Sequence, residues 1–181
     1  MTEPRNSPSP TSAPHSPPVA LGTPDLTLVA LSPAAALDLG AGGTGGFTWI
    51  EGGPEEGTRI GASHVAKAAA DGTYAPGWGT YVMVRRSDGL AVGAIGFHGP
   101  PADGRAEIGY DVVAAARRNG YATQSLRVLT VWALQTVPTV IARTDPANIG
   151  SQRALERVGF TRMPRTDPEW IPYTIAGDGV R

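Results

Sequence analysis

The sequence predicts an α/β (α+β) fold, in which helices cover both faces of a mixed central sheet of about six to seven strands. Residues 79–113 contain three apolar, β-branched segments separated by glycine-containing turns, a pattern typical of an antiparallel meander. The third segment, 106–113, leads through a short turn into a helical pattern at 120–135 and then into a strand at 139–144. A strand–helix–strand connection of this length joins two parallel strands in a right-handed crossover. The sheet is therefore expected to contain one parallel pair beside its antiparallel strands.

The chain divides into a tail and one domain. Residues 1–24 are dominated by proline and serine, and they bury too little apolar surface to offset the entropy lost on ordering. We expect a disordered tail over 1–24 and a single domain over 25–181. With 41% hydrophobic residues in 181, the chain can build one full core.

The first half of the domain is expected to run strand, helix, helix. Residues 25–31 have the composition of a strand, and Ser32, followed by a proline, fits the N-cap of a short helix through residue 39. The pattern of residues 55–70 predicts a longer helix, which ends at an Asp-Gly pair. The meander then begins at residue 79.

A glycine run over residues 40–46 matches G-x-G-x-x-G. In dinucleotide-binding proteins this loop directly follows a strand and opens a helix. Here it follows the predicted short helix and leads into residues 47–50, so we interpret it as a flexible connection. The glycines beside Phe47 and Trp49 could instead form one wall of a substrate cleft.

The end of the domain is expected to add one helix and two strands. A helical pattern runs from about residue 149 to 157, and Gly159 fits its C-cap. The remaining strands are expected around 161–163 and 173–176, which brings the sheet to its predicted size.

Composition excludes several classes of function. The formal net charge is −1, so there is no general basic field that would attract nucleic acid. Cysteine is absent, which excludes disulfides, cysteine nucleophiles and thiolate metal sites and fits a cytoplasmic location. His15, His64 and His98 are far apart in the sequence, so no metal site is expected, and His64 is expected at the surface or half-buried. No apolar run is long enough to span a membrane.

Two motifs point to a ligand. The first is Arg117-x-x-Gly120-x-Ala122, which lies between the strand at 106–113 and the following helix. Free backbone N–H groups meet at a helix N-terminus, and the helix dipole adds about half a positive charge, so this turn predicts an anion site. The second motif lies on the next strand–helix–strand unit and reads Asn148-x-x-Ser151-x-x-x-Leu155-x-x-x-Gly159-Phe160.

Together these motifs resemble the GNAT superfamily of acyl-CoA-dependent N-acyltransferases. The runs Glu107-Ile108-Gly109-Tyr110 and Gly120-Tyr121-Ala122-Thr123 are similar to the RimJ/RimL-like branch, which contains the ribosomal-protein N-terminal acetyltransferases. The resemblance covers roughly residues 25–176. It implies a GNAT fold, in which the two parallel strands splay apart. Three positions depart from the branch pattern and leave the backbone donors in place: Ala114 stands for a proline, Arg118 for a glycine and Gln124 for a glutamate.

The resemblance implies an N-acetyltransferase that moves an acetyl group directly from acetyl-CoA to a primary amine. The N–H groups of residues 118–123 would face the CoA pyrophosphate, and the pantetheine would pair like a strand with the backbone near Val112 and Val113. A backbone N–H near Val113 would also stabilise the oxyanion. Asn148 would reach the pantetheine from the other side or would serve as a turn and helix cap, and both roles can coexist. The residues expected to bind the cosubstrate are Val112, Val113, Arg117, Arg118, Asn119, Gly120, Tyr121, Ala122, Thr123 and Asn148.

Three residues are candidates for acid–base catalysis. Many superfamily members carry a tyrosine as proton donor to the thiolate at the position of Leu155, and in the RimL-like branch the serine matched by Ser151 is the proposed acid. Ser151 could also serve only to cap its helix. Glu107 is the candidate base, because a carboxylate in an apolar strand is expected to have a raised pKa; the alternative is an ion pair with a neighbouring arginine. His98 is a rival base, and a hairpin that pairs 98 with 105 would place it diagonal to Glu107, close enough for a water-linked pair.

The acceptor is expected to be a protein N-terminus or a small amine. Trp49, Tyr74 and Trp78 are candidate walls of a substrate cleft formed by residues 40–50 and 72–80, or else core residues. No motif fixes the acyl group, so a larger donor such as succinyl-CoA stays open. A non-catalytic CoA-binding or sensing module is the alternative function. A homodimer stays open as well, because members of the superfamily often dimerise.

Overall fold

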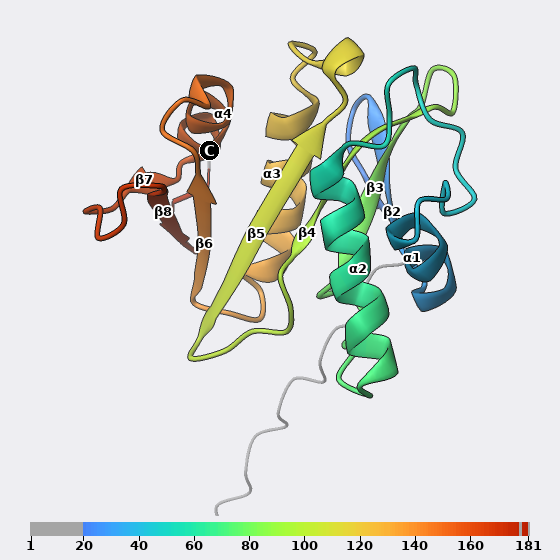
Figure 1. Cartoon of the computed structure of the whole chain (residues 1–181). Helices are drawn as coiled ribbons and strands as arrows, with labels where there is room; N and C mark the ends of the chain where they lie inside the picture. Colours follow the sequence, from blue (N-terminus) through green and yellow to red (C-terminus); the bar gives the residue numbers. More distant parts are fainter. Residues whose placement is uncertain (1–19, 178, 181) are drawn as a thin grey trace, which may run out of the picture.

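A computed structural model of the chain describes residues 20–177 and 179–180, and within them all strands belong to one sheet. The strand order is β1-β2-β3-β4-β5-β6-β8-β7 (Figure 1). Only β5 and β6 are parallel; the other neighbouring pairs are antiparallel. The strands are β1 (Ala20–Gly22), β2 (Leu26–Ala30), β3 (Thr80–Arg85), β4 (Ala91–Phe97), β5 (Arg105–Val112), β6 (Thr139–Thr144), β7 (Thr161–Arg162) and β8 (Ile171–Ala176).

Helices cover both faces of the sheet, as predicted. On one face lie α1 (Pro33–Gly40) and α2 (Glu56–Ala70), and on the other lie α3 (Tyr121–Ala133) and α4 (Ile149–Val158). Figure 1 shows α2 in front of the sheet and α3 behind it. A single 3₁₀ turn, η1 (Ala114–Ala116), joins β5 to the loop before α3. None of these helices is long and apolar enough to cross a bilayer.

The predicted order of helices and strands is confirmed, with one strand added at the front. Strand β1 pairs antiparallel with β2, so the sheet has eight strands rather than six to seven. This strand, Ala20–Gly22, lies within residues 1–24, which we expected to be a disordered tail. The ordered domain therefore begins earlier than the expected residue 25. Buried Thr23 holds the turn after β1, because its hydroxyl accepts the N–H of Leu26 (2.9 Å) and donates to Gln124 on α3 (2.9 Å). Residues 1–19 of the expected tail lie outside the described residues.

The glycine run 40–46 is a connection between helices. It begins at the end of α1, and the next helix starts only at Glu56, after Trp49 has formed a bridge with Ala91 of β4. Neither a strand before the run nor a helix directly after it is present, so the requirements of a dinucleotide loop are not met.

The parallel pair splays apart. β5 and β6 are paired only at Arg105↔Thr139, Ala106↔Val140 and Glu107↔Ile141, although β5 continues to Val112. In Figure 1 the two strands meet at their lower ends and diverge upward. Beyond Glu107, the side of β5 that faces β6 is therefore left without a partner strand.

The register between β4 and β5 differs from the one we expected. The partners are Gly96↔Gly109 and Phe97↔Ile108, and the N–H of His98 donates to the carbonyl of Glu107 (3.0 Å). Residues 98 and 107 are thus directly opposite, whereas the expected register paired 98 with 105. The tight turn is at Asp103-Gly104, where φ is 49° and 72° and Ala102 pairs with Arg105. Residues 99–101, which include two prolines without N–H donors, bulge out on the β4 side.

Candidate active site

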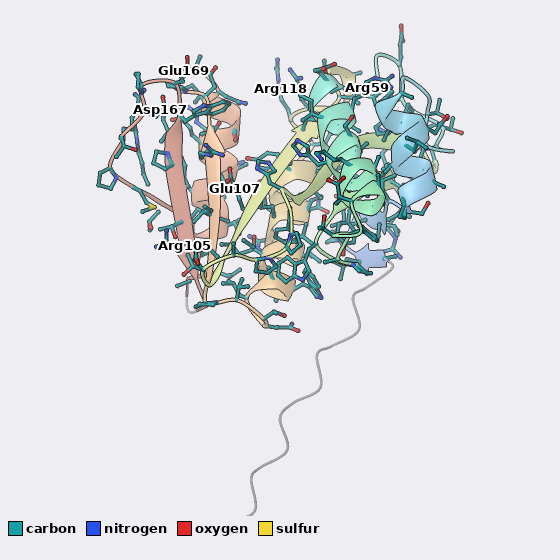
Figure 2. The ribbon with its side chains drawn as sticks, turned by 60° about the horizontal axis from the view of Figure 1, so that its bottom comes forward. Arg59, Arg105, Glu107, Arg118, Asp167 and Glu169 are labelled. Atoms are coloured by element: carbon teal, nitrogen blue, oxygen red, sulfur yellow. The ribbon has the colours of Figure 1, made fainter. Side chains whose placement is uncertain are left out.

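A cavity of about 410 Å³ opens between α2 and the adjoining parts of β4 and β5, and it is also lined by Arg143 of β6 and by Trp170, directly before β8. Side chains alternate along β5, so Glu107, Gly109 and Asp111 face α2 while Tyr110 and Val112 face α3. Figure 2 shows Glu107 between the two halves of the sheet, with Arg105 and Arg118 near opposite ends of β5. The polar and aromatic side chains that line this cavity include His64, His98, Glu107, Asp111, Arg143 and Trp170.

Glu107 is a paired carboxylate at the base of this cavity. Its Oε1 accepts from Arg143 Nε (2.7 Å), its Oε2 accepts from Arg143 Nη2 (3.2 Å), and His98 Nδ1 lies 3.3 Å from Oε1. The contacts with His98 and with Arg143 lower the pKa of Glu107 to about 2, and they outweigh the opposing effect of burial. The expectation of a raised pKa was wrong, and the ion pair that we kept as the alternative is confirmed. A carboxylate that holds its charge this firmly is a weak base and a good electrostatic partner.

His98 contacts the same carboxylate as Arg143, so that His98, Glu107 and Arg143 form one cluster. Its Nδ1 side is directed to Glu107, and its Nε2 lies over Gly109, where a Cβ would approach the nitrogen to 2.7 Å. The imidazole is about half exposed, and its ring meets that of His64 edge to face at 6.2 Å. The direct contact with Glu107 replaces the diagonal, water-linked pair that we expected, because the register brings the two residues opposite each other.

Asp111 is a site residue that the sequence reasoning missed. Its carboxylate accepts the N–H and the hydroxyl of Thr58 (2.5 and 2.6 Å) and the N–H of Ala94 (3.3 Å), while burial raises its pKa. It therefore holds the first turn of α2 against the sheet. Gly57 permits this approach, since a Cβ there would lie 2.7 Å from Asp111 Oδ2. The available signal was an acid within an otherwise apolar strand.

The turn before α3 has the geometry of an anion cradle. Gly120 (φ 75°) and Arg118 (φ 66°) both adopt the left-handed conformation, which explains why glycine is usual at the position of Arg118 in the RimJ/RimL-like branch. Within the part of the chain that the structure describes, the N–H groups of residues 118–123 find no acceptor. The side chain of Asn119 holds the turn by donating to the carbonyls of Ala116 (3.0 Å) and Arg117 (3.2 Å). The cradle thus fits a phosphate group through its backbone.

The two arginines of this turn differ. The guanidinium of Arg117 donates to Glu55 Oε1 (3.2 Å) and to the carbonyl of Val112 (2.9 Å), and Glu55 also accepts the N–H of Ala114 (3.0 Å). Arg117 therefore fastens the loop after β5 to the start of α2, instead of being free for a phosphate as we expected. Arg118 is exposed, and no partner is found for its guanidinium among residues 20–177.

The splay leaves a row of backbone groups on β5 unpaired. Because 98↔107 is a hydrogen-bonded pair of the antiparallel ladder, the odd-numbered residues of β5 bond to β4 and the even-numbered ones face β6. Past the end of the parallel pairing, Tyr110 and Val112 thus present their N–H groups to the gap. Val113 does not, because its N–H donates to Val92 (2.9 Å) and its side chain is buried. This corrects the expectation that Val113 pairs with pantetheine, and it means that an oxyanion donor near this position is not the N–H of Val113 itself.

Ser151 lies on the other face of the sheet, at the first turn of α4. Its Oγ is 2.8 Å from the hydroxyl of Tyr110, and its N–H donates to Asn148 Oδ1 (3.0 Å). Asn148 is thus the N-cap of α4, as its alternative role predicted. The sequence motif Glu107-Ile108-Gly109-Tyr110 predicts no role for Tyr110, and the structure brings its hydroxyl to the serine.

The aromatic residues expected to line the acceptor cleft lie elsewhere. Trp78 packs against Phe97 and Trp132 with ring centroids 4.8 Å apart, and Trp49 and Tyr74 pack against the cluster under α1 and α2. None of the three lines the cavity, whose aromatic lining comes from Phe97, Tyr110 and Trp170 instead. A shallower hollow beside the cavity is lined by residues 40–42, together with Ile60 and His64 of α2. The glycine run therefore does border a hollow, without Phe47 or Trp49.

Comparisons with known proteins point to one family of acetyltransferases. The profile of the acetyltransferase (GNAT) domain matches residues 47–161. The uncharacterized N-acetyltransferase YjdG of Bacillus subtilis is 37% identical over 87 residues, which are 46% of this chain and 52% of that protein. The chain thus spans about half the length of this curated relative.

Solved structures agree in fold. An acetyltransferase from Agrobacterium tumefaciens is 26% identical with a TM-score of 0.60, over 94% of this chain and 99% of that one. Two more distant proteins share the fold. Ribosomal-protein-S5-alanine acetyltransferase from Vibrio fischeri is 12% identical with a TM-score of 0.61, over 91% of this chain and 100% of that one. RimJ of Mycobacterium smegmatis in complex with CoA-disulfide is 19% identical with a TM-score of 0.54, over 84% of this chain and 82% of that one. Because the family profile matches more than half of its residues, the chain belongs to the GNAT family of N-acetyltransferases, in the RimJ/RimL-like branch that its motifs predict.

Proposed function

We propose that this protein transfers the acetyl group of acetyl-CoA to a primary amine by direct attack. The observation that carries the proposal is the position of the His98–Glu107–Arg143 cluster. It lies in a cavity on the α2 face, beside the point where β5 and β6 separate. An acyl donor bound in that gap would reach the cavity from the side of α3, and an amine would reach it from the side of α2.

The cosubstrate is assigned to the turn before α3 and to the gap. The free N–H groups of residues 118–123 and the exposed Arg118 would hold the pyrophosphate, and the unpaired N–H groups of Tyr110 and Val112 would hold the pantetheine. Acetyl-CoA supplies a thioester that an uncharged amine can attack.

In this assignment His98 accepts the proton of the attacking amine. The negatively charged Glu107 orients the imidazole through Nδ1, stabilises the imidazolium that forms, and is held in turn by Arg143. Ser151 donates a hydrogen bond from its hydroxyl to the leaving sulfur, which takes its proton from water. Glu107 thus changes from the base that we expected to the carboxylate that supports the base.

Thiol release from acetyl-CoA with a panel of peptides and small amines tests the proposal, with mass spectrometry of the acetylated product. We expect His98→Ala to lower kcat by about 10²- to 10⁴-fold, the range for removal of a general base, and His64→Gln to have a much smaller effect. Saturable CoA binding that is unaffected by Ser151→Ala, together with no turnover on any amine of the panel, would instead favour the sensing module. NAD binding without CoA binding would overturn the acyltransferase assignment.

Four finer points stay predictions: the acyl group, the class of acceptor, the location and the oligomeric state. Parallel assays with succinyl-CoA test whether a larger acyl group is used, and peptides against small amines test the class of acceptor. The cytoplasmic location and the homodimer stay separate predictions, because the proposed chemistry does not depend on either.

A further inference from the structure

Tyr110 and Ser151 form a pair of hydroxyl groups beside the gap between β5 and β6. The Tyr110 oxygen lies 2.8 Å from Ser151 Oγ and 3.2 Å from the carbonyl oxygen of Ser151. Within residues 20–177 no other group contacts Ser151 Oγ, and the serine N–H is already bound to Asn148. The orientation of the serine hydroxyl is therefore decided by Tyr110.

Each hydroxyl has one hydrogen, so the contacts allow two arrangements. In one, Tyr110 donates to the Ser151 carbonyl and accepts the serine hydrogen, which is then not available to a ligand. In the other, Tyr110 donates to Ser151 Oγ, and the serine hydrogen is free to point into the gap. Burial raises the pKa of Tyr110 to about 12, so the phenol keeps its hydrogen at neutral pH in both arrangements.

We propose that Tyr110 is a positioning residue that donates to Ser151 Oγ and thereby directs the serine hydrogen to the sulfur of the leaving group. This inference rests on the proposed function, because it requires acyl transfer at the gap. It differs from the role expected of Ser151, since the serine does not act alone.

The bonds of the step balance without a proton leaving either residue. When the carbon–sulfur bond breaks, its electron pair goes to sulfur, and the thiolate accepts a hydrogen bond from Ser151, which accepts one from Tyr110. A thiol has a pKa of about 8.5, far below that of the buried phenol, so the proton stays on Tyr110. The thiolate takes its proton from water, and the proton of the amine goes to His98.

The test is a double-mutant cycle on Tyr110→Phe and Ser151→Ala, followed by kcat and by KM for acetyl-CoA. We expect Tyr110→Phe to lower kcat about tenfold, because its hydroxyl acts on the developing charge of the sulfur only through Ser151. The KM for acetyl-CoA should change less than about twofold. Ser151→Ala removes the same contact from the other side and should lower kcat at least as much. In the Ser151→Ala background, Tyr110→Phe should have no further effect.

Tyr173→Phe is the matched control. Its hydroxyl is also buried beneath α4, yet it donates to Glu156 (3.1 Å) and not to the serine. Tyr173→Phe should lower the melting temperature by an amount similar to Tyr110→Phe and should leave kcat unchanged.

The possible failures differ. If wild-type protein releases no thiol with any amine, the proposed function and this inference fail together. If wild-type protein is active and the two substitutions multiply in the double variant, Tyr110 acts independently of Ser151, and this inference alone is overturned. A loss confined to KM would overturn it as well, because it would mark a binding role.

Discussion

Glu107→Gln isolates the charge of the carboxylate that holds His98 and Arg143. Glutamine keeps the size and shape of the side chain and one acceptor oxygen, but it carries no charge at any pH. The wild-type carboxylate has a pKa of about 2 against an ordinary value of 4.5, because His98 and Arg143 favour its charged form. A group whose pKa is lowered by folding stabilises the protein above its unfolded pKa, and this contribution is lost as the pH falls toward the folded pKa.

The size of the effect follows from this shift. A difference of about 2.5 pKa units corresponds to about 3 kcal/mol at neutral pH, at 1.36 kcal/mol for each unit. Both partners are about half exposed, so water screens the pair, and we expect about 1–2 kcal/mol to remain. Wild-type protein should exceed Glu107→Gln in stability by this amount at pH 7, and the difference should shrink between pH 4.5 and pH 2.

Urea unfolding at a series of pH values from 7 to 3 measures this difference. Asp88→Asn is the control, since Asp88 is also paired with an arginine (2.6 Å to Arg85) but lies at the surface, and it should show a smaller dependence on pH. If the unfolding free energies of wild type and Glu107→Gln stay parallel down to pH 3, the ion pairs do not stabilise the fold and the reasoning is refuted.

Two further substitutions test the geometry. Gly109→Ala should displace the imidazole of His98, because the new Cβ would lie 2.7 Å from its Nε2. We expect this variant to lower kcat by about 10- to 100-fold. Gly177→Ala is the control and should leave kcat unchanged, because no atom lies within 4 Å of its new Cβ. Arg118→Gly should raise the stability of the free protein by about 0.5–1 kcal/mol in thermal unfolding, because φ is 66° there, and should weaken CoA binding in calorimetry. Equal stability of Arg118→Gly and wild type would argue against strain at this turn, and unchanged CoA affinity would argue against a role of Arg118 in phosphate binding.

The order of helices and strands could be predicted because the signals are local. Hydrophobic periodicity, the Ser32 cap and the glycine at the end of α4 each depend on a few neighbouring residues, and the structure contains all three features. Strand β1 could not be found in the same way, because three residues after a proline-rich tail become a strand only through pairing with β2.

The geometry of the proposed catalytic cluster depends on non-local features. The position of His98 opposite Glu107 depends on where the hairpin turns, and the sequence of the loop allowed a different register. The lowered pKa of Glu107 then depends on His98 and also on Arg143, which comes from β6, 36 residues further along the chain. Val113 illustrates the same limit, since the direction of its N–H follows from the register and not from its identity.

The separation of β5 from β6 creates an internal edge in the sheet. At the outer border of a sheet, unpaired N–H and C=O groups can recruit a strand from another molecule, which leads to aggregation. Here the unpaired part of β5 lies between two strands of the same sheet, with β4 bonded along its other side. The protein thus keeps a strand edge open to a slender extended ligand without presenting it at the sheet border, where a second copy of the chain could pair with it.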